Sequence, residues 1–430
     1  MLPRCTLHVA TAGLSFVICC LLLIVGCAVR QQETTTPDEP AELMTIEIAR
    51  GVVDEVMPEV ERLRGLEFKQ PVPVEVVSDE DLRTYMSKRL DSLQSEEELR
   101  NGQRAYQLLG LLPESIDIVE IIMKALEEQA AGYYDPSTSS YYLIDDMPAE
   151  MASILTAHEL THALEDQHFD LDSRIRDNLN DDDRIFAVSS VHEGSATLLM
   201  TQYMTARLLR GELSLEMLTS PDLDITRAEA LNELPPVLQR QLLGPYILGA
   251  LFLVQGNMLA MAAQSFPVED VDHAYDNGPL SSEQILHAEK FWDPQERDDP
   301  KPVDLTGVGT LLGDGWQPVT RGVLGELVLA VMTGTDEPID PQAAMLAGAA
   351  AWTNEAASGW GGDRWEMWER DGRAVVLLSI RWDSPDDAQE FVDVIDGTPA
   401  FRWKRNGDRV AIVAGEAGVD VSAAIDAMLE

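Results

Sequence analysis

The sequence predicts an α+β protein that is mainly helical up to about residue 345 and ends in a small α+β module. Two observations support this fold class. Apolar residues recur at helical spacing through most of the chain, whereas roughly the last seventy residues alternate between apolar and polar side chains around short turns. We therefore expect a main domain over residues 43–345 and a C-terminal module over residues 360–430.

The first elements follow from the spacing of apolar residues. Residues 43–64 carry apolar side chains three or four positions apart, which predicts an amphipathic helix, and residues 79–93 and 96–111 continue in the same style. Between them, residues 72–77 alternate and are rich in valine, which favours a strand. Further on, Gly132–Asp135 and residues 141–144 flank four serines and threonines, so we expect a hairpin there.

The segment that follows the hairpin reads His158-Glu159-Leu160-Thr161-His162, the H-E-x-x-H motif. Two histidines four residues apart on a helix lie on the same face, one turn apart, and can bind one ion. Zn²⁺ favours such imidazole ligands, and a catalytic zinc site leaves one position for water. Glu159 is then the expected general base, taking a proton from the water and passing it to the leaving amine.

The residues around this motif bear on how specific it is. H-E-x-x-H also arises by chance on surface helices, but a surface helix carries charge on most of its turns. Residues 151–164 contain one acidic residue among apolar and small ones, so we expect a buried helix and a metal site.

The third ligand has three candidates. His168 has the position of the third histidine in the metzincin motif H-E-x-x-H-x-x-G-x-x-H. However, Glu165 stands where that motif has glycine, and a continuing helix turns His168 about 240° away from the zinc face. Glu193 is favoured over it, with a helix expected to begin there and run toward Arg210, and His192 is the remaining candidate.

Downstream, residues 242–255 are apolar but too short to span a bilayer, so we expect a buried core helix. In the last part of the chain we expect a helix at residues 384–395, a hairpin at 401–413 around Asn406-Gly407, and a helix from Val421.

The N-terminus predicts the compartment. One basic residue, a short apolar stretch and the sequence Ile24-Val25-Gly26-Cys27 are typical of a bacterial lipoprotein leader. We expect residues 1–26 to be removed, Cys27 to be lipidated and residues 27–42 to form a polar tether; a plain secretory leader is the alternative. All four cysteines lie at or before residue 27, so no disulfide is expected in the mature fold.

The charge of the chain restricts its partners. The net charge is −44, from 75 acidic and 31 basic residues, and such a surface repels the phosphates of nucleic acids. It also repels anionic lipid headgroups, so membrane attachment is expected to depend on the lipid anchor.

Three motifs together resemble those of a bacterial gluzincin-like (HExxH…E) zinc metallopeptidase family whose members are often lipoproteins: His158-Glu159-Leu160-Thr161-His162, then Glu193-Gly194-Ser195-Ala196, then the stretch from Ser281 to Phe291. The resemblance implies a mainly helical zincin-like domain with a small edge-strand sheet. It also implies that Glu193, from a second helix, completes the zinc site.

The same resemblance suggests roles for further residues. Strand residues Tyr141 and Tyr142 are expected to bind the substrate backbone at a sheet edge, because zincins place an edge strand just before the zinc helix. Thr197 is expected to support Glu193 from one turn away, although such families often have aspartate there. His287 is expected either to stabilise the oxyanion or to be a structural histidine.

The expected function is zinc-dependent hydrolysis of peptide bonds in proteins or peptides of the bacterial cell envelope. The alternative is a noncatalytic envelope-binding or assembly lipoprotein on a metallopeptidase scaffold.

Overall fold

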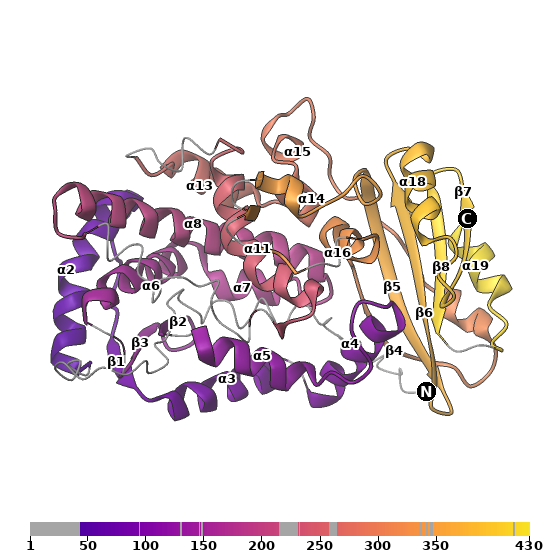
Figure 1. Cartoon of the computed structure of the whole chain (residues 1–430), viewed down its shortest axis with the longest axis horizontal. Coiled ribbons are helices and arrows are strands. Elements are labelled where there is room, and N and C mark those ends of the chain that lie inside the picture. The colour runs from indigo at the N-terminus through magenta and orange to yellow at the C-terminus, as the bar shows by residue number, and fades with distance from the viewer. Residues whose placement is uncertain are drawn as a thin grey trace, which may run out of the picture.

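The computed structural model describes residues 44–430, except 94, 130, 146, 148, 215–230, 232, 258–264, 335–337, 341–342, 345–346 and 416–417. The predicted leader, the lipidation site Cys27 and the tether all lie outside the described residues, so they stay predictions. The described part is mixed α+β, as the sequence predicts: a helical body with a small sheet is followed by a C-terminal antiparallel sheet (Figure 1).

The helical body contains the elements up to residue 332, apart from one strand of the C-terminal sheet and a short 3-10 helix. Its helices are α2 (Ile46–Arg64), α3 (Asp79–Leu93), α4 (Glu96–Leu108), α5 (Ile118–Gln129), α6 (Ala149–Phe169), α7 (Leu171–Arg176), α8 (Asp182–Leu209), α11 (Pro236–Leu253), α13 (Val268–Asn277), α14 (Ser282–Leu286), α15 (Glu289–Trp292) and α16 (Gly325–Met332). None of the helices in the described part of the chain is long and apolar enough to cross a membrane.

The predicted helices in this first part of the chain are confirmed: α3 has both predicted ends, whereas the start of α2 and the end of α4 differ. Helix α2 begins at Ile46 because Thr45 caps it, its hydroxyl accepting a hydrogen bond from the Ile48 N–H. Helix α4 ends at Leu108, three residues before the predicted end, and the chain turns at Gly110 with a φ of 76° that favours glycine.

The small sheet corrects one expectation. Its strands are β1 (Val74–Val77), β2 (Gly132–Asp135) and β3 (Ser140–Ile144), in the order β1-β3-β2, with β3 parallel to β1 and antiparallel to β2. The hairpin is therefore confirmed, but Tyr141 and Tyr142 lie on the central strand. The expectation that these two residues offer a free edge is wrong, because β1, distant in sequence, pairs with β3 on its other side. Within this sheet, β2 has the free edge that faces α6.

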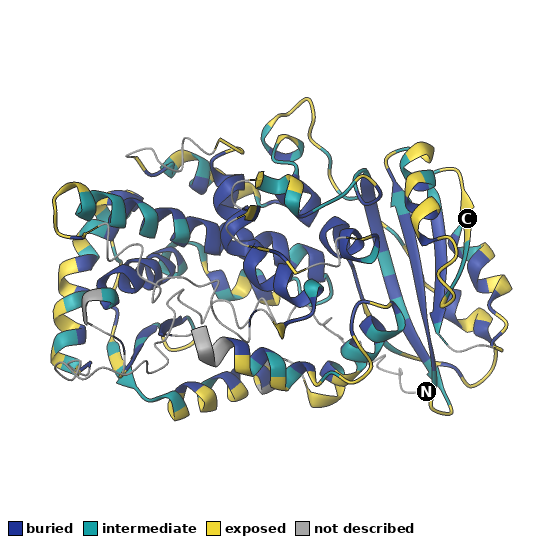
Figure 2. Cartoon of the chain, in the orientation of Figure 1, coloured by how far each residue is buried: buried dark blue, intermediate teal, exposed yellow. Residues whose placement is uncertain are grey.

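Three buried helices form the centre of the body. Residues 152–165 of α6, most of residues 182–199 of α8 and nearly all of α11 are buried, whereas α2, α3 and α4 expose one side (Figure 2). Helices α8 and α11 touch backbone to backbone: a Cβ on Gly194 would lie 2.3 Å from the carbonyl carbon of Gly249, and a Cβ on Gly249 would lie 2.0 Å from the Ser190 carbonyl oxygen. Glycine at both positions permits this approach. The core helix expected at residues 242–255 is confirmed as part of α11, which continues through Pro245.

The C-terminal sheet has the strand order β4-β5-β6-β8-β7 and is antiparallel throughout. Its strands are β4 (Gln317–Gly322), β5 (Trp360–Arg370), β6 (Arg373–Trp382), β7 (Phe401–Asn406) and β8 (Arg409–Gly415), with α18 (Pro385–Ile395), α19 (Ser422–Met428) and the 3-10 helices η3 (Val308–Leu312) and η4 (Gly348–Ala351) nearby. The predicted strands and helices of this region are confirmed. In addition, β4 joins the sheet from before residue 360.

The two faces of this sheet have different cores. Val375, Leu377 and Val413 face η3 and α19 in a separate apolar cluster. Val376, Leu378 and the neighbouring side chains on the other face belong to the core that also includes α18 and the helical body. The helical body and the sheet therefore share one continuous core on that face.

Candidate metal centre

Helix α6 presents His158 and His162 from its buried middle. Residues 152–165 are all buried, as the flanking sequence predicts. The two Nε2 atoms lie 3.1 Å apart, and the rings meet edge to face with centroids 4.7 Å apart. On another side, the Tyr246 ring of α11 stacks on His158 with centroids 6.0 Å apart. The imidazole planes are thus held by packing.

Helix α8 brings Glu193 to the same point. Its Oε2 lies 3.2 Å from His158 Nε2 and 3.4 Å from His162 Nε2, and all three side chains are buried. We call these three residues the His-His-Glu triad. The expected start of this helix at Glu193 is wrong, because α8 begins at Asp182, capped by Asp181. Glu193 is therefore in the middle of a 28-residue helix, where packing against α6 holds it more firmly than a helix end would.

The triad fits a metal ion in geometry and in donor chemistry. For Zn²⁺ bonds of about 2.0 to 2.1 Å, the ligand atoms of a tetrahedral site are about 3.3 Å apart. The three observed separations, 3.1, 3.2 and 3.4 Å, are close to this value. Two further buried atoms, Glu193 Oε1 and Glu159 Oε1, have no hydrogen-bond partner, and an uncompensated buried acceptor costs about 1 to 3 kcal/mol.

The pKa values within the site follow from burial and from the triad's own charges. Burial raises the pKa of Glu193, but the two histidines outweigh it and hold that pKa at about 2. Burial lowers the pKa of both histidines; for His162 the charge of Glu193 reverses this and raises the pKa to about 9, whereas His158 stays below its usual value. Imidazole nitrogens bind a metal only when deprotonated, so metal binding at this triad is expected to release protons.

Glu159 lies beside the triad, next to the free edge of β2. The backbone N–H of Tyr134 donates to Glu159 Oε2 over 2.8 Å. Burial raises the pKa of Glu159 to about 8. A carboxylate whose pKa is near neutrality can both accept and return a proton, which is what a general base must do.

The other two candidates for the third ligand lie elsewhere. Helix α6 continues through Glu165 to Phe169, so His168 turns away, and its Nε2 lies 2.9 Å from the Glu67 carbonyl oxygen. His192 is buried and stacks on Tyr275 with centroids 5.7 Å apart. Neither belongs to the group of ligand atoms that converge with His158 and His162.

The structure does not connect Thr197 or His287 to the triad. The Thr197 hydroxyl is buried and makes no hydrogen bond, so no contact supports the expected link to Glu193. His287 follows α14, and its Nε2 lies 2.9 Å from Glu326 Oε1 on α16. Burial lowers the pKa of His287, but Glu326 outweighs it and raises that pKa. These contacts favour the structural alternative for His287.

One carboxylate near the site was missed from the sequence. Glu165 is fully buried on α6 and accepts hydrogen bonds from Arg64 of α2, Ser195 of α8 and Tyr275 of α13. Its sequence signal was weak, because Glu165 directly follows the apolar stretch and is itself followed by Asp166 and Gln167. The sequence gives no sign of its partners, which come from up to 110 residues away.

A second group of ligand atoms lies where α14 and α15 meet the C-terminal sheet. Carboxylate oxygens of Glu283, Asp298 and Asp383 all lie within 4.8 Å of one another. Here Lys290 occupies the centre, with its Nζ 2.6, 3.1 and 3.0 Å from the three carboxylates. We call this the lysine-centred cluster. Glu283 and Lys290, both in the stretch from Ser281 to Phe291, thus have a structural role in this cluster.

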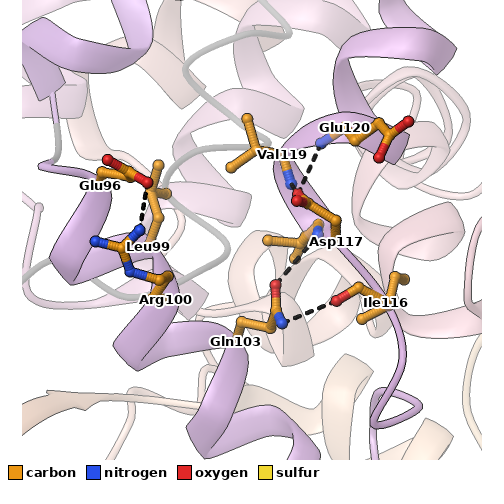
Figure 3. A pocket seen from close by; sticks show the side chains of 9 residues that line it. Glu96, Leu99, Arg100, Gln103, Ile116, Asp117, Val119 and Glu120 are labelled. Carbon is orange, nitrogen blue, oxygen red and sulfur yellow. Dashed lines mark hydrogen bonds and ion pairs between the residues drawn. The ribbon is translucent and has the colours of Figure 1, made fainter.

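A surface hollow of about 450 Å³ lies away from both groups, between α4 and the start of α5 (Figure 3). Several of its polar side chains bond to other residues that line the hollow. Asp117 caps α5 by accepting from the N–H groups of Val119 and Glu120, Gln103 bonds the backbone of residues 116 and 118, and Arg100 pairs with Glu96. These contacts cap α5 and join it to α4, so they explain the polar residues of the hollow without a ligand.

Comparison with known proteins gives one match. Residues 317–398 match a family described as a domain of unknown function (DUF8575). The matched segment runs from β4 to just past α18, so it includes the strand that joins the C-terminal sheet from before residue 360. No curated protein sequence and no solved structure matches the chain significantly.

Proposed function

We propose that the chain is a zinc-dependent peptidase that hydrolyses peptide bonds in proteins or peptides of the bacterial envelope. The observation that carries the proposal is the convergence of His158, His162 and Glu193 at tetrahedral spacing, with Glu159 beside them. The three motifs resemble those of gluzincin-like metallopeptidases, and the order of hairpin, H-E-x-x-H helix and glutamate helix is consistent with a zincin-like domain.

The residues have distinct roles in this proposal. His158, His162 and Glu193 hold the metal through Nε2, Nε2 and Oε2. Bound zinc acidifies a water molecule and polarises the carbonyl of the scissile bond. Glu159 takes the proton from the attacking water and returns it to the departing amine; its high pKa suits both transfers.

The substrate backbone is proposed to lie along β2. This strand has the free edge on the side of α6, and its Tyr134 N–H already reaches Glu159. Main-chain hydrogen bonds along such an edge bind extended peptides with little dependence on sequence. Gly132 and Tyr134 would then face the peptide in place of Tyr141 and Tyr142. They lie on the edge strand β2, whereas β3 is paired on both sides.

The predicted lipid anchor at Cys27 places the protein on an envelope membrane, where the acidic surface keeps it from binding nucleic acid. Membrane attachment through Cys27 and the lack of nucleic-acid binding are both part of what we propose.

One observation favours the alternative, a noncatalytic envelope-binding or assembly lipoprotein on a metallopeptidase scaffold. The triad and Glu159 are buried, with relative exposures of 0 to 1%. A peptide reaches them only if covering segments move, whereas a structural metal site needs no access.

The test uses the full chain purified in detergent, with metal content measured by elemental mass spectrometry and cleavage of casein followed on the same samples. We expect about one zinc per chain, lost in Glu193→Ala and retained in the matched control His168→Ala. Glu159→Gln should keep the zinc and reduce cleavage by about 10²- to 10⁴-fold. Zinc binding without cleavage in the wild type would support the scaffold alternative, and a chain that binds no zinc would exclude the peptidase and leave the scaffold alternative.

A further inference from the structure

Glu165 joins the two helices that supply the metal ligands. It lies three residues after His162 on α6, and its Oε1 accepts a 2.6 Å hydrogen bond from the hydroxyl of Ser195, which is two residues after Glu193 on α8. His158 and His162 come from one helix and Glu193 from the other, so the ligand distances depend on how these helices are held together. The Glu165–Ser195 bond is a direct side-chain link between them.

The rest of the network fixes the Glu165 carboxylate in place. Arg64 Nε donates to Oε1 over 2.6 Å, and the Tyr275 hydroxyl donates to Oε2 over 2.7 Å. Arg64 and Glu165 are both fully buried, and Arg64 also pairs with Asp272. Tyr275 is itself held between Phe169 and His192, with ring centroids at 4.3 and 5.7 Å. Both carboxylate oxygens thus have fixed donors.

The network around Glu165 provides hydrogen bonds near the triad that the imidazoles themselves do not make. The Nδ1 atoms of His158 and His162 have no hydrogen-bond partner, and the Thr197 hydroxyl has none either. In many metal sites such outer contacts orient the ligands directly, and their loss weakens metal binding 10- to 100-fold. We infer that Glu165 is a positioning residue for the metal centre: through Ser195 it sets the distance between His162 on α6 and Glu193 on α8.

This inference rests on the proposed function, and its test separates the two. Ser195→Ala removes the link between α6 and α8 with little change in volume. Ser190→Ala is the matched control: Ser190 is equally buried on α8, but its hydroxyl bonds only the Phe186 carbonyl of its own helix. Tyr275→Phe removes another bond to the same carboxylate without cutting the link.

The measurements are the zinc affinity of the full chain by competition with a chromophoric chelator, the visible spectrum of the Co²⁺-substituted protein, and urea unfolding of the metal-free protein. Ser195→Ala should weaken zinc binding at least 10-fold and change the Co²⁺ spectrum, which reports coordination geometry. Ser190→Ala and Tyr275→Phe should stay within about threefold of the wild type.

Equal zinc affinities for Ser195→Ala and Ser190→Ala would overturn the inference and leave the proposed function intact. A uniform loss in Ser195→Ala and Tyr275→Phe that follows the stability of the metal-free protein would also overturn it, because the network would then be purely structural. A wild-type chain that binds no zinc would overturn the proposed function and this inference together.

Discussion

The His-His-Glu triad and the lysine-centred cluster meet the same geometric criterion in different ways. Each brings three potential ligand atoms within 4.8 Å. In the cluster, three carboxylates surround the ammonium of Lys290, and Lys301 pairs with Asp383 as well. In the triad, a single carboxylate faces two imidazoles, and those imidazoles are the groups that hold the pKa of Glu193 down.

The difference shows that convergence of ligand atoms does not by itself identify a metal site. The cluster already contains a cation from the protein, and it ties α14 and α15 to the C-terminal sheet. The triad consists of the donors that Zn²⁺ prefers and leaves Glu193 Oε1 without a hydrogen-bond partner. A lysine ammonium at the centre marks the cluster as a structural group, whereas the donor types of the triad make it a candidate metal centre.

The role of Lys290 in the cluster is tested most directly by removing its ammonium group. Lys290→Met leaves three carboxylates facing one another, and we expect the free energy of unfolding at pH 7 to fall by about 3 to 4 kcal/mol, since breaking a buried ion pair typically costs 3 to 5 kcal/mol and this one is partly exposed. Urea denaturation measures it. Millimolar Ca²⁺ should restore part of the loss, because carboxylate oxygens are its usual ligands.

Lys301→Met is the control for that variant. Lys301 is more exposed than Lys290 and pairs with one carboxylate of the cluster, so its loss should cost less than about 1 kcal/mol and show no response to Ca²⁺. Equal effects of the two substitutions would show that Lys290 is no more central than its neighbour.

Asp363 is a buried carboxylate of a third kind, because its hydrogen-bond donors are neutral. It accepts from the N–H groups of Leu324 and Gly325 and from the Trp360 indole. Burial raises its pKa from 3.8 to about 6. The folded protein therefore binds this proton more tightly than the unfolded chain. The resulting stabilisation, about 3 kcal/mol, is fully present below pH 4 and is lost as the pH rises through 6.

Urea unfolding of the wild type and of Asp363→Asn between pH 4 and 7 tests this. The relevant quantity is the change of unfolding free energy with pH, since Asn also alters the hydrogen bonds. We expect the wild type to lose about 2 kcal/mol more than the variant over this range. Parallel pH profiles would contradict a raised pKa for Asp363.

The smallest expected effect concerns Thr197. Its hydroxyl has no hydrogen-bond partner, so Thr197→Val should change zinc affinity less than about twofold, in contrast to Ser195→Ala. Chelator competition measures both variants side by side. A loss of tenfold or more in Thr197→Val would restore the role that the motif resemblance suggests for this residue.

Much of the local structure was predictable from the sequence, because it depends on residues that are neighbours in the chain. The spacing of apolar residues predicted α3 with both its ends, and the Asn406-Gly407 turn predicted the hairpin of β7 and β8. The four-residue spacing of His158 and His162 likewise placed both imidazoles on one face of a helix. The start of α8 was missed because the acidic residues of its first turns are buried against α14, where Asp183 accepts from the Ser282 N–H.

Tertiary structure decided the features that depend on distant segments. Whether Glu193 or His192 meets the two histidines depended on how α8 packs against α6. Pairing with β1 made β3 a central strand and left β1 and β2 as the two edge strands. The sequence by itself supplied the metal-binding side chains at helical spacing; long-range packing selected the third one and placed Glu165 where it joins the two ligand helices.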